Sequence, residues 1–244
     1  MFIFTKIIRK LRFYLSVNWT KTLYFNFKKF PFAIAKQLPV YFYGKVSFQN
    51  INGKVRIEAP IKSAMIGFGQ QYESNTCSNG TAEIFIEGTV TFKGHVQFGK
   101  DYFVYVSKDA YLEMGHMSSL GSNGKIICYN KIILGKFARI GFESQVMDST
   151  FHQMIDTLTG HKYVMKSPII IGSYNYIGNR VSIMSKTVTP DYCTISSSSF
   201  CNKDYATLGK NILIGGIPAK LLRANTSRDW DTEIPNLERF LTIK

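Results

Sequence analysis

A six-residue repeat between Ile171 and Ala206 constrains this chain more than any other feature of the sequence. The segment divides into six consecutive hexads, which read IGSYNY, IGNRVS, IMSKTV, TPDYCT, ISSSSF and CNKDYA. A period of six fits neither an α-helix nor an alternating β-strand. It is typical of a solenoid in which short flat strands each turn an aliphatic residue inward, so that three hexads complete a triangular coil. The repeat therefore predicts a mainly β chain built as a parallel β-helix.

The same register extends upstream, with slips. Inward residues are expected at Ile86, Phe92, Phe98, Val106, Leu112, Met114, Leu120, Ile126, Ile132, Leu134, Ile140 and Val146. We expect the two-residue steps, Leu112 to Met114 and Ile132 to Leu134, to be bulged corners, which a solenoid tolerates because each coil contacts only its neighbours. An antiparallel barrel would show alternation with hairpin turns about every 8 to 12 residues, so the period of six favours the solenoid.

Glycine follows the inward residue at several of these corners. The positions are 99, 115, 121, 135, 141, 172 and 178. Glycine suits a corner where φ is positive or where the backbone of the next coil comes close. Both explanations are consistent with the sequence.

Charge and cysteine usage limit the setting in which the chain works. Residues 1–57 contain eleven Lys or Arg and no Asp or Glu, whereas the remainder holds 19 basic and 16 acidic residues. The cysteines at 77, 128, 193 and 201 form no C-x-x-C pair and fit neither a zinc knuckle nor a disulfide framework. Charges interrupt every apolar run of residues 1–20, which predicts neither a signal peptide nor a membrane span. We expect a reducing cytoplasm.

The basic N-terminal segment, residues 1–40, predicts one or two aromatic-rich helices broken near Pro31 and closed at Pro39. Its apolar residues fall at near-helical spacing, at Phe2, Ile3, Ile7, Ile8, Leu11 and Leu15. Two roles remain open. Residues 1–36 could contact an anionic membrane surface from its inner face, or the segment could cap the first coil or pack between subunits. No nucleic-acid motif accompanies the charge, so nucleic acid is not an expected partner.

We expect three parts in all: residues 1–40, a β-helix over 41–223 and a C-terminal tail with a short helix over 224–244. Residues 41–83 should open the solenoid, and residues 153–168 interrupt the repeat as a loop insertion. The other end closes at GGIPAK, residues 215–220.

Two segments resemble a known family. The hexads followed by CNKDYATLGKNILIGGIPAKLLR resemble the C-terminal signature of the hexapeptide-repeat acyltransferases. A second segment, SNGKIICYNKIILGKFARIGFESQVMDSTFHQM, is similar to sugar O-acetyltransferases of bacterial polysaccharide clusters, relatives of the maltose and galactoside acetyltransferases. Over roughly residues 20–224, the resemblance implies a left-handed parallel β-helix, a homotrimer and acetyl-CoA as donor.

His152 is the candidate general base. Of the four histidines, at 95, 116, 152 and 161, only His152 lies where the repeat breaks, and it matches the family's catalytic histidine. An imidazole can take the proton of a hydroxyl that attacks a thioester. Asp148 is expected either to orient this imidazole or contact the sugar, or to cap a corner. The resemblance assigns acceptor contacts to Asn123 and Glu143.

The resemblance also implies a set of donor-binding residues, and no metal. Asn179, Ser197 and Asn202 match positions beside the pantetheine, and Tyr176 stands where relatives carry an aromatic wall. Lys203 and Lys220 match the lysines of the donor site, with Arg180, Lys186 and Arg223 as further cations for the phosphates.

Some positions depart from the family. Lys162 replaces a glutamate of the maltose-type relatives, which puts their small acceptors in doubt, and ISSSSF replaces a small-small-Gly run.

From the resemblance and the candidate site residues, we expect O-acetylation of a sugar in capsule or lipopolysaccharide assembly. N-acetylation of an amino-sugar nucleotide is the alternative. A γ-type carbonic anhydrase would need three zinc histidines in a different spacing, and a non-catalytic scaffold would leave the lysines at 203 and 220 without a purpose.

Overall fold

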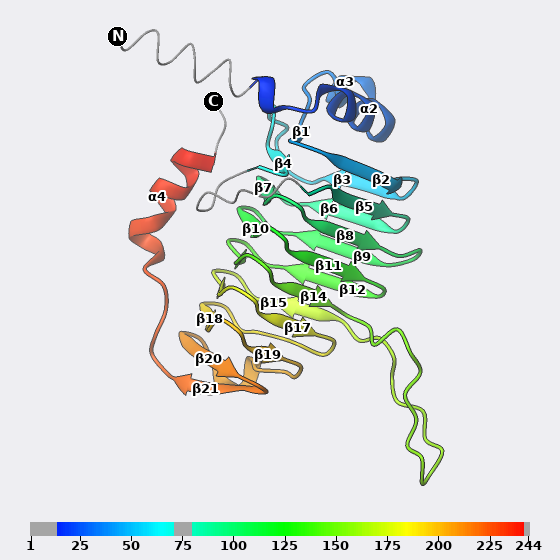
Figure 1. The fold of residues 1–244 in the computed structure, drawn as a ribbon. Helices are drawn as coiled ribbons and strands as arrows, with labels where there is room; N and C mark the ends of the chain where they lie inside the picture. The colour runs from blue at the N-terminus through cyan, green and yellow to red at the C-terminus, as the bar shows by residue number, and fades with distance from the viewer. Residues whose placement is uncertain (1–13, 71–79, 242–244) are drawn as a thin grey trace.

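The chain winds as a left-handed parallel β-helix whose coils stack from the N-terminal end downward (Figure 1). The computed structural model describes residues 14–70 and 80–241. Three sheets run along the solenoid. The first sheet has nine strands, in the order β1 (Val40–Phe42), β4 (Ile66–Phe68), β7 (Val96–Phe98), β10 (Ser118–Leu120), β13 (Arg139–Ile140), β16 (Tyr176–Ile177), β18 (Cys193–Ile195), β20 (Ile212–Gly216) and β21 (Ala219–Arg223).

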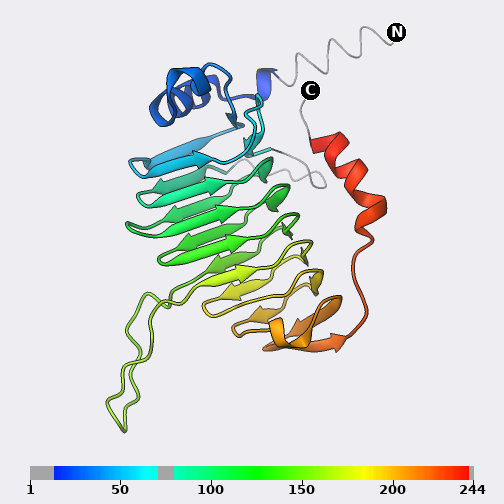
Figure 2. The same ribbon diagram turned by 180° about the vertical axis from the view of Figure 1, so that it is seen from behind.

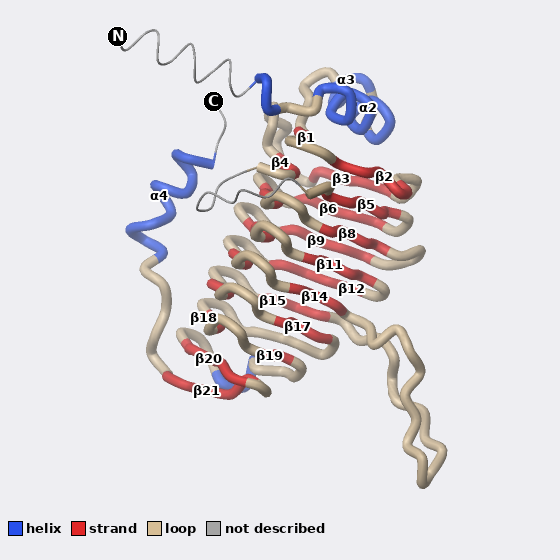
Figure 3. Tube along the Cα trace, viewed as in Figure 1, coloured by secondary structure: helices blue, strands red, loops and turns tan. Residues whose placement is uncertain are grey.

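The other two sheets contain shorter series. The second holds seven strands: β2 (Val46–Asn50), β5 (Ala82–Ile86), β8 (Phe103–Val106), β11 (Lys125–Cys128), β14 (Gln145–Met147), β17 (Ser182–Met184) and β19 (Phe200–Cys201). The third holds five: β3 (Lys54–Ile57), β6 (Thr89–Phe92), β9 (Tyr111–Met114), β12 (Lys131–Leu134) and β15 (Ile169–Ile171). Figure 3 shows how short these strands are and how regularly turns separate them.

The predicted inward register is confirmed. Every inward residue named from Ile86 to Val146, and every first residue of the six hexads, is at most 3% exposed. The two-residue steps are not bulged corners, however. Leu112 and Met114 lie in one strand, β9, and Ile132 and Leu134 lie in β12, so each strand simply turns two alternate side chains inward.

Close approach of the next coil explains the corner glycines. A Cβ added to Gly135 would lie 2.6 Å from the carbonyl carbon of Gly172, and one added to Gly172 would lie 2.5 Å from that of Pro190. Real Cβ atoms do not approach backbone this closely, so a larger residue would push the coils apart. Stacking distance therefore selects glycine at these two corners.

The N-terminal helices cap the first coil. Helix α2 (Trp19–Lys29) buries Phe25 and Asn26 against β1, and Asn26 both donates to the carbonyl of Val40 and accepts from its N–H. A short helix, α3 (Phe32–Ala35), follows Pro31. Both breaks fall near the predicted prolines, although the apolar residues from Phe2 to Leu11 lie outside the described part of the chain.

The C-terminal end closes with a hairpin and then returns along the solenoid. Strand β21 pairs antiparallel with β20, a 3-10 turn covers Ala206–Leu208, and helix α4 (Trp230–Leu241) runs back beside the coils (Figure 2). Among the described residues no helix is both long and apolar enough to span a bilayer.

The three edges of the prism differ in their side chains, and each takes its name from the residues of its turns. The polar corner joins the first sheet to the second, at residues 121–124, 141–144, 178–181 and 196–199. The histidine corner joins the second to the third, at residues 148–168, 185–187 and 202–204. The aromatic corner joins the third to the first, at residues 115–117, 135–138, 172–175 and 190–192.

Candidate functional site

His152 lies at the histidine corner, in the turn that follows β14. The imidazole of His152 is exposed. The backbone N–H of His152 donates to the backbone carbonyl of Thr150 at 2.7 Å. The preceding residue, Phe151, has a φ of 60°, a left-handed conformation that is costly for a bulky residue. Ser149 stabilises this turn, because its hydroxyl accepts from the N–H of Phe151 at 3.0 Å. The turn thus fixes the backbone that carries the imidazole.

The insertion is a two-stranded ribbon that projects far from the solenoid (Figure 1). Antiparallel bridges join Ser149 to Lys166 and Ile155 to Lys162, so the ribbon begins a few residues before the predicted insertion and contains His152. Several large apolar residues of the ribbon are exposed, and Leu158 is 96% exposed. Apolar residues on a projecting arm indicate a surface made for a partner.

Two predicted donor cations lie on the same corner as His152. Strand β14 pairs with β17, and β17 pairs with β19, so the turns that follow these strands stack in successive coils. Those turns carry His152, then Lys186, then Asn202 and Lys203, all exposed. Coils of a sheet are about 4.8 Å apart. The structure therefore brings the candidate base and the two lysines together along one edge.

A second group of predicted residues lies on the polar corner instead. It comprises Asn123, Glu143, Asn179, Arg180 and Ser197. The Nε of Arg180 donates to a carboxylate oxygen of Glu143 at 2.6 Å, which links the predicted donor and acceptor contacts of this corner. Within one chain, the width of the second sheet separates this group from His152.

Asp148 caps a corner. It is 0% exposed, and its carboxylate accepts from the N–H groups of Tyr129, Asn130 and Lys131 at 2.7 to 2.8 Å. Three backbone donors on one carboxylate satisfy the turn between β11 and β12. Asp148 was expected either to orient the imidazole of His152 or contact the sugar, or to cap a corner. The hydrogen bonds that it makes are those of a corner cap.

The remaining donor candidates lie on the first sheet. Tyr176, in β16, is partly covered by the guanidinium of Arg228, whose carbon lies 5.0 Å from the ring centroid. Lys220 and Arg223 are exposed on β21, at the C-terminal end of the solenoid. None of the three lies on the corner that carries His152.

Sequence reasoning missed an aromatic stack on the second sheet. The rings of Phe85 and Tyr105 stack at 4.5 Å, those of Tyr105 and Tyr129 at 5.2 Å, and Phe151 meets Tyr129 edge-on at 5.1 Å. The stack reaches the turn of His152 from the N-terminal side. The sequence does contain a signal for this stack, because the outward residues of each strand alternate with the inward residues that the repeat assigns.

The four histidines lie in two separate pairs. No group of three or more His, Cys, Asp or Glu side chains is placed to hold a metal ion in residues 14–70 and 80–241. His95 and His116 lie together near the aromatic corner, 5.9 Å between ring centroids, whereas His152 and His161 belong to the ribbon.

The hexads, the inward register and the three parallel sheets define a class: the chain is a hexapeptide-repeat β-helix protein. No family model matches the sequence, and no curated protein matches it. Among solved structures, the chain is similar to the polySia-specific acetyltransferase NeuO, with 19% identity, 78% of each chain covered and a TM-score of 0.49.

Two further solved structures are similar in the same way. The polysialic acid O-acetyltransferase OatWY shares 17% identity over 78% of this chain and 98% of its own, with a TM-score of 0.48. AntD, an N-acyltransferase from Bacillus cereus in complex with dTDP and 3-hydroxybutyryl-CoA, shares 14% identity over 83% of this chain and 86% of its own, with a TM-score of 0.40.

Proposed function

We propose that the chain is an acetyl-CoA-dependent O-acetyltransferase that acts on a sugar hydroxyl of a surface polysaccharide. One observation carries the proposal: His152, Lys186 and Lys203 follow one another along the histidine corner. A general base and cations for a phosphorylated donor are what such a transfer requires. The motif resemblance of the sequence adds the reaction class.

The chemistry needs a base and no covalent enzyme intermediate. The imidazole of His152 takes the proton of the sugar hydroxyl as its oxygen attacks the thioester carbonyl. The carbon–sulfur bond then breaks, the acetyl group stays on the sugar oxygen, and the proton returns to the departing thiolate. Asp148 has a structural role in this proposal, since its carboxylate is occupied by backbone N–H groups.

The donor would extend from His152 toward the C-terminal coils. Lys186 and Lys203 would meet its phosphates, and Asn202 would contact its pantetheine. The ammonium of Lys203 lies 5.5 Å from the ring centroid of Tyr205, within the range of a cation–π contact. Charge-assisted contacts to phosphate contribute about 1.5 to 3 kcal/mol each.

The polar-corner residues would join the site from a second copy of the chain. We propose a homotrimer in which Asn123, Glu143, Asn179, Arg180 and Ser197 of one copy face the histidine corner of its neighbour. The exposed apolar residues of the ribbon, among them Leu158, give that neighbour a surface to pack against. Tyr176, Lys220 and Arg223 would line the first-sheet side of the same groove.

The location we propose is the cytoplasmic face of a membrane on which the glycan is assembled. Residues 1–57 supply the reason, because they contain eleven basic and no acidic residues. An anionic lipid surface attracts such a segment by about 1 kcal/mol for each basic residue near it.

Mass spectrometry of surface polysaccharide, from cells with and without the gene, tests the proposal. We expect one acetyl group per repeat to disappear with the gene, and mild base to remove the same group from the intact polymer, because esters hydrolyse readily and amides do not. An acetyl group that resists base would favour N-acetylation of an amino sugar. If purified protein fails to bind acetyl-CoA by calorimetry, the proposal is wrong.

A further inference from the structure

Helix α2 exposes large apolar side chains on its outer face. The inner face, with Thr22, Phe25 and Asn26, is buried on the first coil. The outer face carries Leu23, Tyr24 and Phe27, which are 43%, 51% and 49% exposed. A helix that only capped a solenoid would present polar residues to water. Tyr24 also stacks on Phe48 of β2, with 6.3 Å between the ring centroids, but the outer face of α2 as a whole is more apolar than capping requires.

The apolar outer face continues into α3. Phe32 is 72% exposed, and its ring lies 6.1 Å from that of Phe27. Leu23, Tyr24, Phe27 and Phe32 are called the outer apolar patch below. They belong to consecutive turns of the two helices that lie over the first coil (Figure 1). An exposed cluster of large apolar residues marks an interaction surface.

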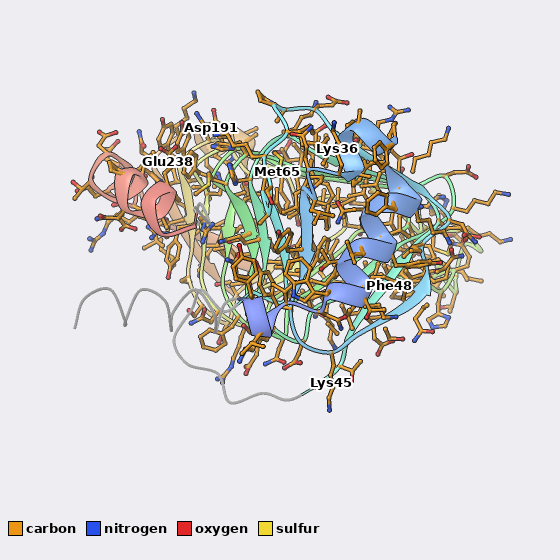
Figure 4. The ribbon with its side chains drawn as sticks, turned by 90° about the horizontal axis from the view of Figure 1, so that it is seen from above. Lys36, Lys45, Phe48, Met65, Asp191 and Glu238 are labelled. Carbon is orange, nitrogen blue, oxygen red and sulfur yellow. The ribbon has the colours of Figure 1, made fainter. Side chains whose placement is uncertain are left out.

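The charge around the outer apolar patch has one sign. Figure 4 looks down on this end and shows Lys36 and Lys45 at the edges of the cap. The ammonium of Lys28 donates to the hydroxyl of Tyr24 at 3.2 Å, within the patch itself. Residues 14–57 contain no Asp or Glu, and their basic residues are Lys21, Lys28, Lys29, Lys36, Lys45, Lys54 and Arg56.

This combination argues against a second copy as the occupant. Two such ends facing each other would bring together at least a dozen cations with no acid between them, which like-charge repulsion opposes. An apolar patch surrounded by lysines is instead complementary to a bilayer with anionic headgroups, where rings enter the acyl boundary and ammonium groups meet phosphates.

We propose that the outer apolar patch is a membrane-docking surface that seats the N-terminal end of the solenoid on an anionic phospholipid bilayer. Leu23, Tyr24, Phe27 and Phe32 insert at the headgroup boundary, and Lys28 and Lys36 contact lipid phosphates. This surface is independent of the transfer reaction and does not need His152.

Docking in this orientation sets the height of the candidate base. His152 follows β14, which is four pairings along the second sheet from β2, in the order β2, β5, β8, β11 and β14. At about 4.8 Å for each coil, His152 stands about 20 Å beyond the first coil. In combination with the proposed function, the acceptor is then a lipid-linked glycan or polymer that reaches this height, not the sugar next to the lipid.

Vesicle flotation of the full chain tests the docking surface. The probes are vesicles of phosphatidylcholine alone and of phosphatidylcholine mixed with phosphatidylglycerol. We expect binding to the anionic vesicles that weakens with salt, and little binding to the neutral ones. A Phe27→Ser/Phe32→Ser variant should lose binding by about tenfold or more. Lys28→Glu, a variant that leaves all core residues in place, should lose it by a similar factor.

Two matched variants serve as controls. Ile217→Ser removes an apolar residue that is also exposed but lies in the turn between β20 and β21, at the other end of the solenoid, and Lys125→Glu reverses an exposed charge on β11. Both should bind vesicles as the unchanged protein does. All variants should bind acetyl-CoA normally, so a failure of docking is distinguishable from a failure of the proposed function.

Three results would overturn the docking surface. The first is equal binding of the unchanged protein to neutral and anionic vesicles. The second is unchanged vesicle binding by both the Phe27→Ser/Phe32→Ser variant and the Lys28→Glu variant. The third is a mass by light scattering that doubles in solution for the unchanged protein but not for variants of the outer apolar patch. The last result would assign the patch to a second copy of the chain.

Discussion

The histidine corner and the aromatic corner are built on the same backbone but have opposite surfaces. Both place residues with positive φ at their turns, Lys186 on the first and Phe137, Tyr174 and Tyr192 on the second. The aromatic corner is closed: these three rings stack at 5.4 and 4.8 Å, and Trp230 of α4 packs across them. The histidine corner is open and carries exposed polar and cationic side chains.

This difference shows how a uniform repeat separates stability from function. A coil repeats its backbone hydrogen bonds at every corner, so stability does not require any particular side chain to face outward there. On the aromatic corner those outward side chains bind the returning C-terminal helix. On the histidine corner they remain available to a ligand. Function should therefore respond to changes of outward side chains at the histidine corner, and stability to such changes at the aromatic corner.

The largest effect should come from the open corner. His152→Ala removes the proposed base and should lower acetyl transfer by about a thousandfold, with acetyl-CoA binding and thermal stability unchanged. His161→Ala is the matched control, because His161 is an exposed histidine of the same ribbon. Transfer assays with purified protein measure both variants. Full activity of His152→Ala would remove the histidine corner from the mechanism.

At the closed corner, Trp230→Ala should destabilise the fold without slowing the reaction. Trp230 is 4% exposed and packs on Phe137 and Tyr174, so its loss should reduce the free energy of unfolding by about 3 kcal/mol. Thermal unfolding reports the loss, and Ile217→Ala, at a residue that is 79% exposed, provides an exposed comparison. A variant that is folded at the assay temperature yet inactive would place part of the reaction at the aromatic corner.

Asp148→Asn separates a corner cap from a catalytic partner. The amide keeps the shape of the side chain but turns an NH2 group toward backbone N–H donors, which should lower the free energy of unfolding by about 2 kcal/mol. The pH dependence of transfer should stay the same where the variant is folded. Unchanged stability together with a shifted pH profile would show that Asp148 orients the imidazole of His152.

A smaller effect is expected from the half-buried pair His95 and His116. Burial lowers the pKa of both imidazoles. The nearby charges of His116 and Lys62 lower the pKa of His95 further, and those of Lys136 and Lys62 lower the pKa of His116 further. The carboxylate of Glu238 raises the pKa of each and so opposes the effect of burial. Because the folded-state pKa lies below the unfolded value of about 6.5, the unfolded chain binds more protons as the pH falls. Stability from this pair is complete above about pH 6.5 and is lost below it.

His116→Asn should therefore reduce the loss of stability between about pH 7 and about pH 5, by less than about 1 kcal/mol, since the pair is half exposed. Melting temperatures at the two pH values measure this loss. The amide oxygen can still accept from the N–H of His95, as the Nδ1 of His116 does at 3.3 Å. A steeper fall in the His116 variant would contradict the predicted direction of the effect.

The sequence predicted the solenoid well because the signal was periodic. Inward residues such as Ile126 and Ile183 recur at fixed spacing, and burial depends on that spacing alone. The two-residue steps were misread as corners, since a strand with two inward positions and a bulge give the same spacing. The sequence predicted the N-terminal cap only as one possibility beside membrane contact and packing between subunits. The reason is that amphipathic spacing identifies an apolar helix face but not the surface that this face covers.

The candidate site was less predictable for a physical reason. Residues close in sequence, such as Asn179 and Lys186, lie on different corners. The sequence alone does not show to which of the three corners a given turn belongs. Asp148 illustrates the same limit, because its partners at 129–131 lie one coil away. The contribution of Arg228 above Tyr176 depends on a tail that returns along the solenoid, which no local pattern indicates.

Lysine footprinting with CoA tests the central claim most directly, because one sample compares the two corners. An amine-reactive reagent is applied with and without CoA, and modified lysines are quantified by mass spectrometry. We predict that CoA protects Lys186 and Lys203 on the histidine corner and leaves Lys136, on the aromatic corner, as reactive as before. Protection of Lys136 alone, or of none of the three, would contradict the assignment of the donor to the open corner.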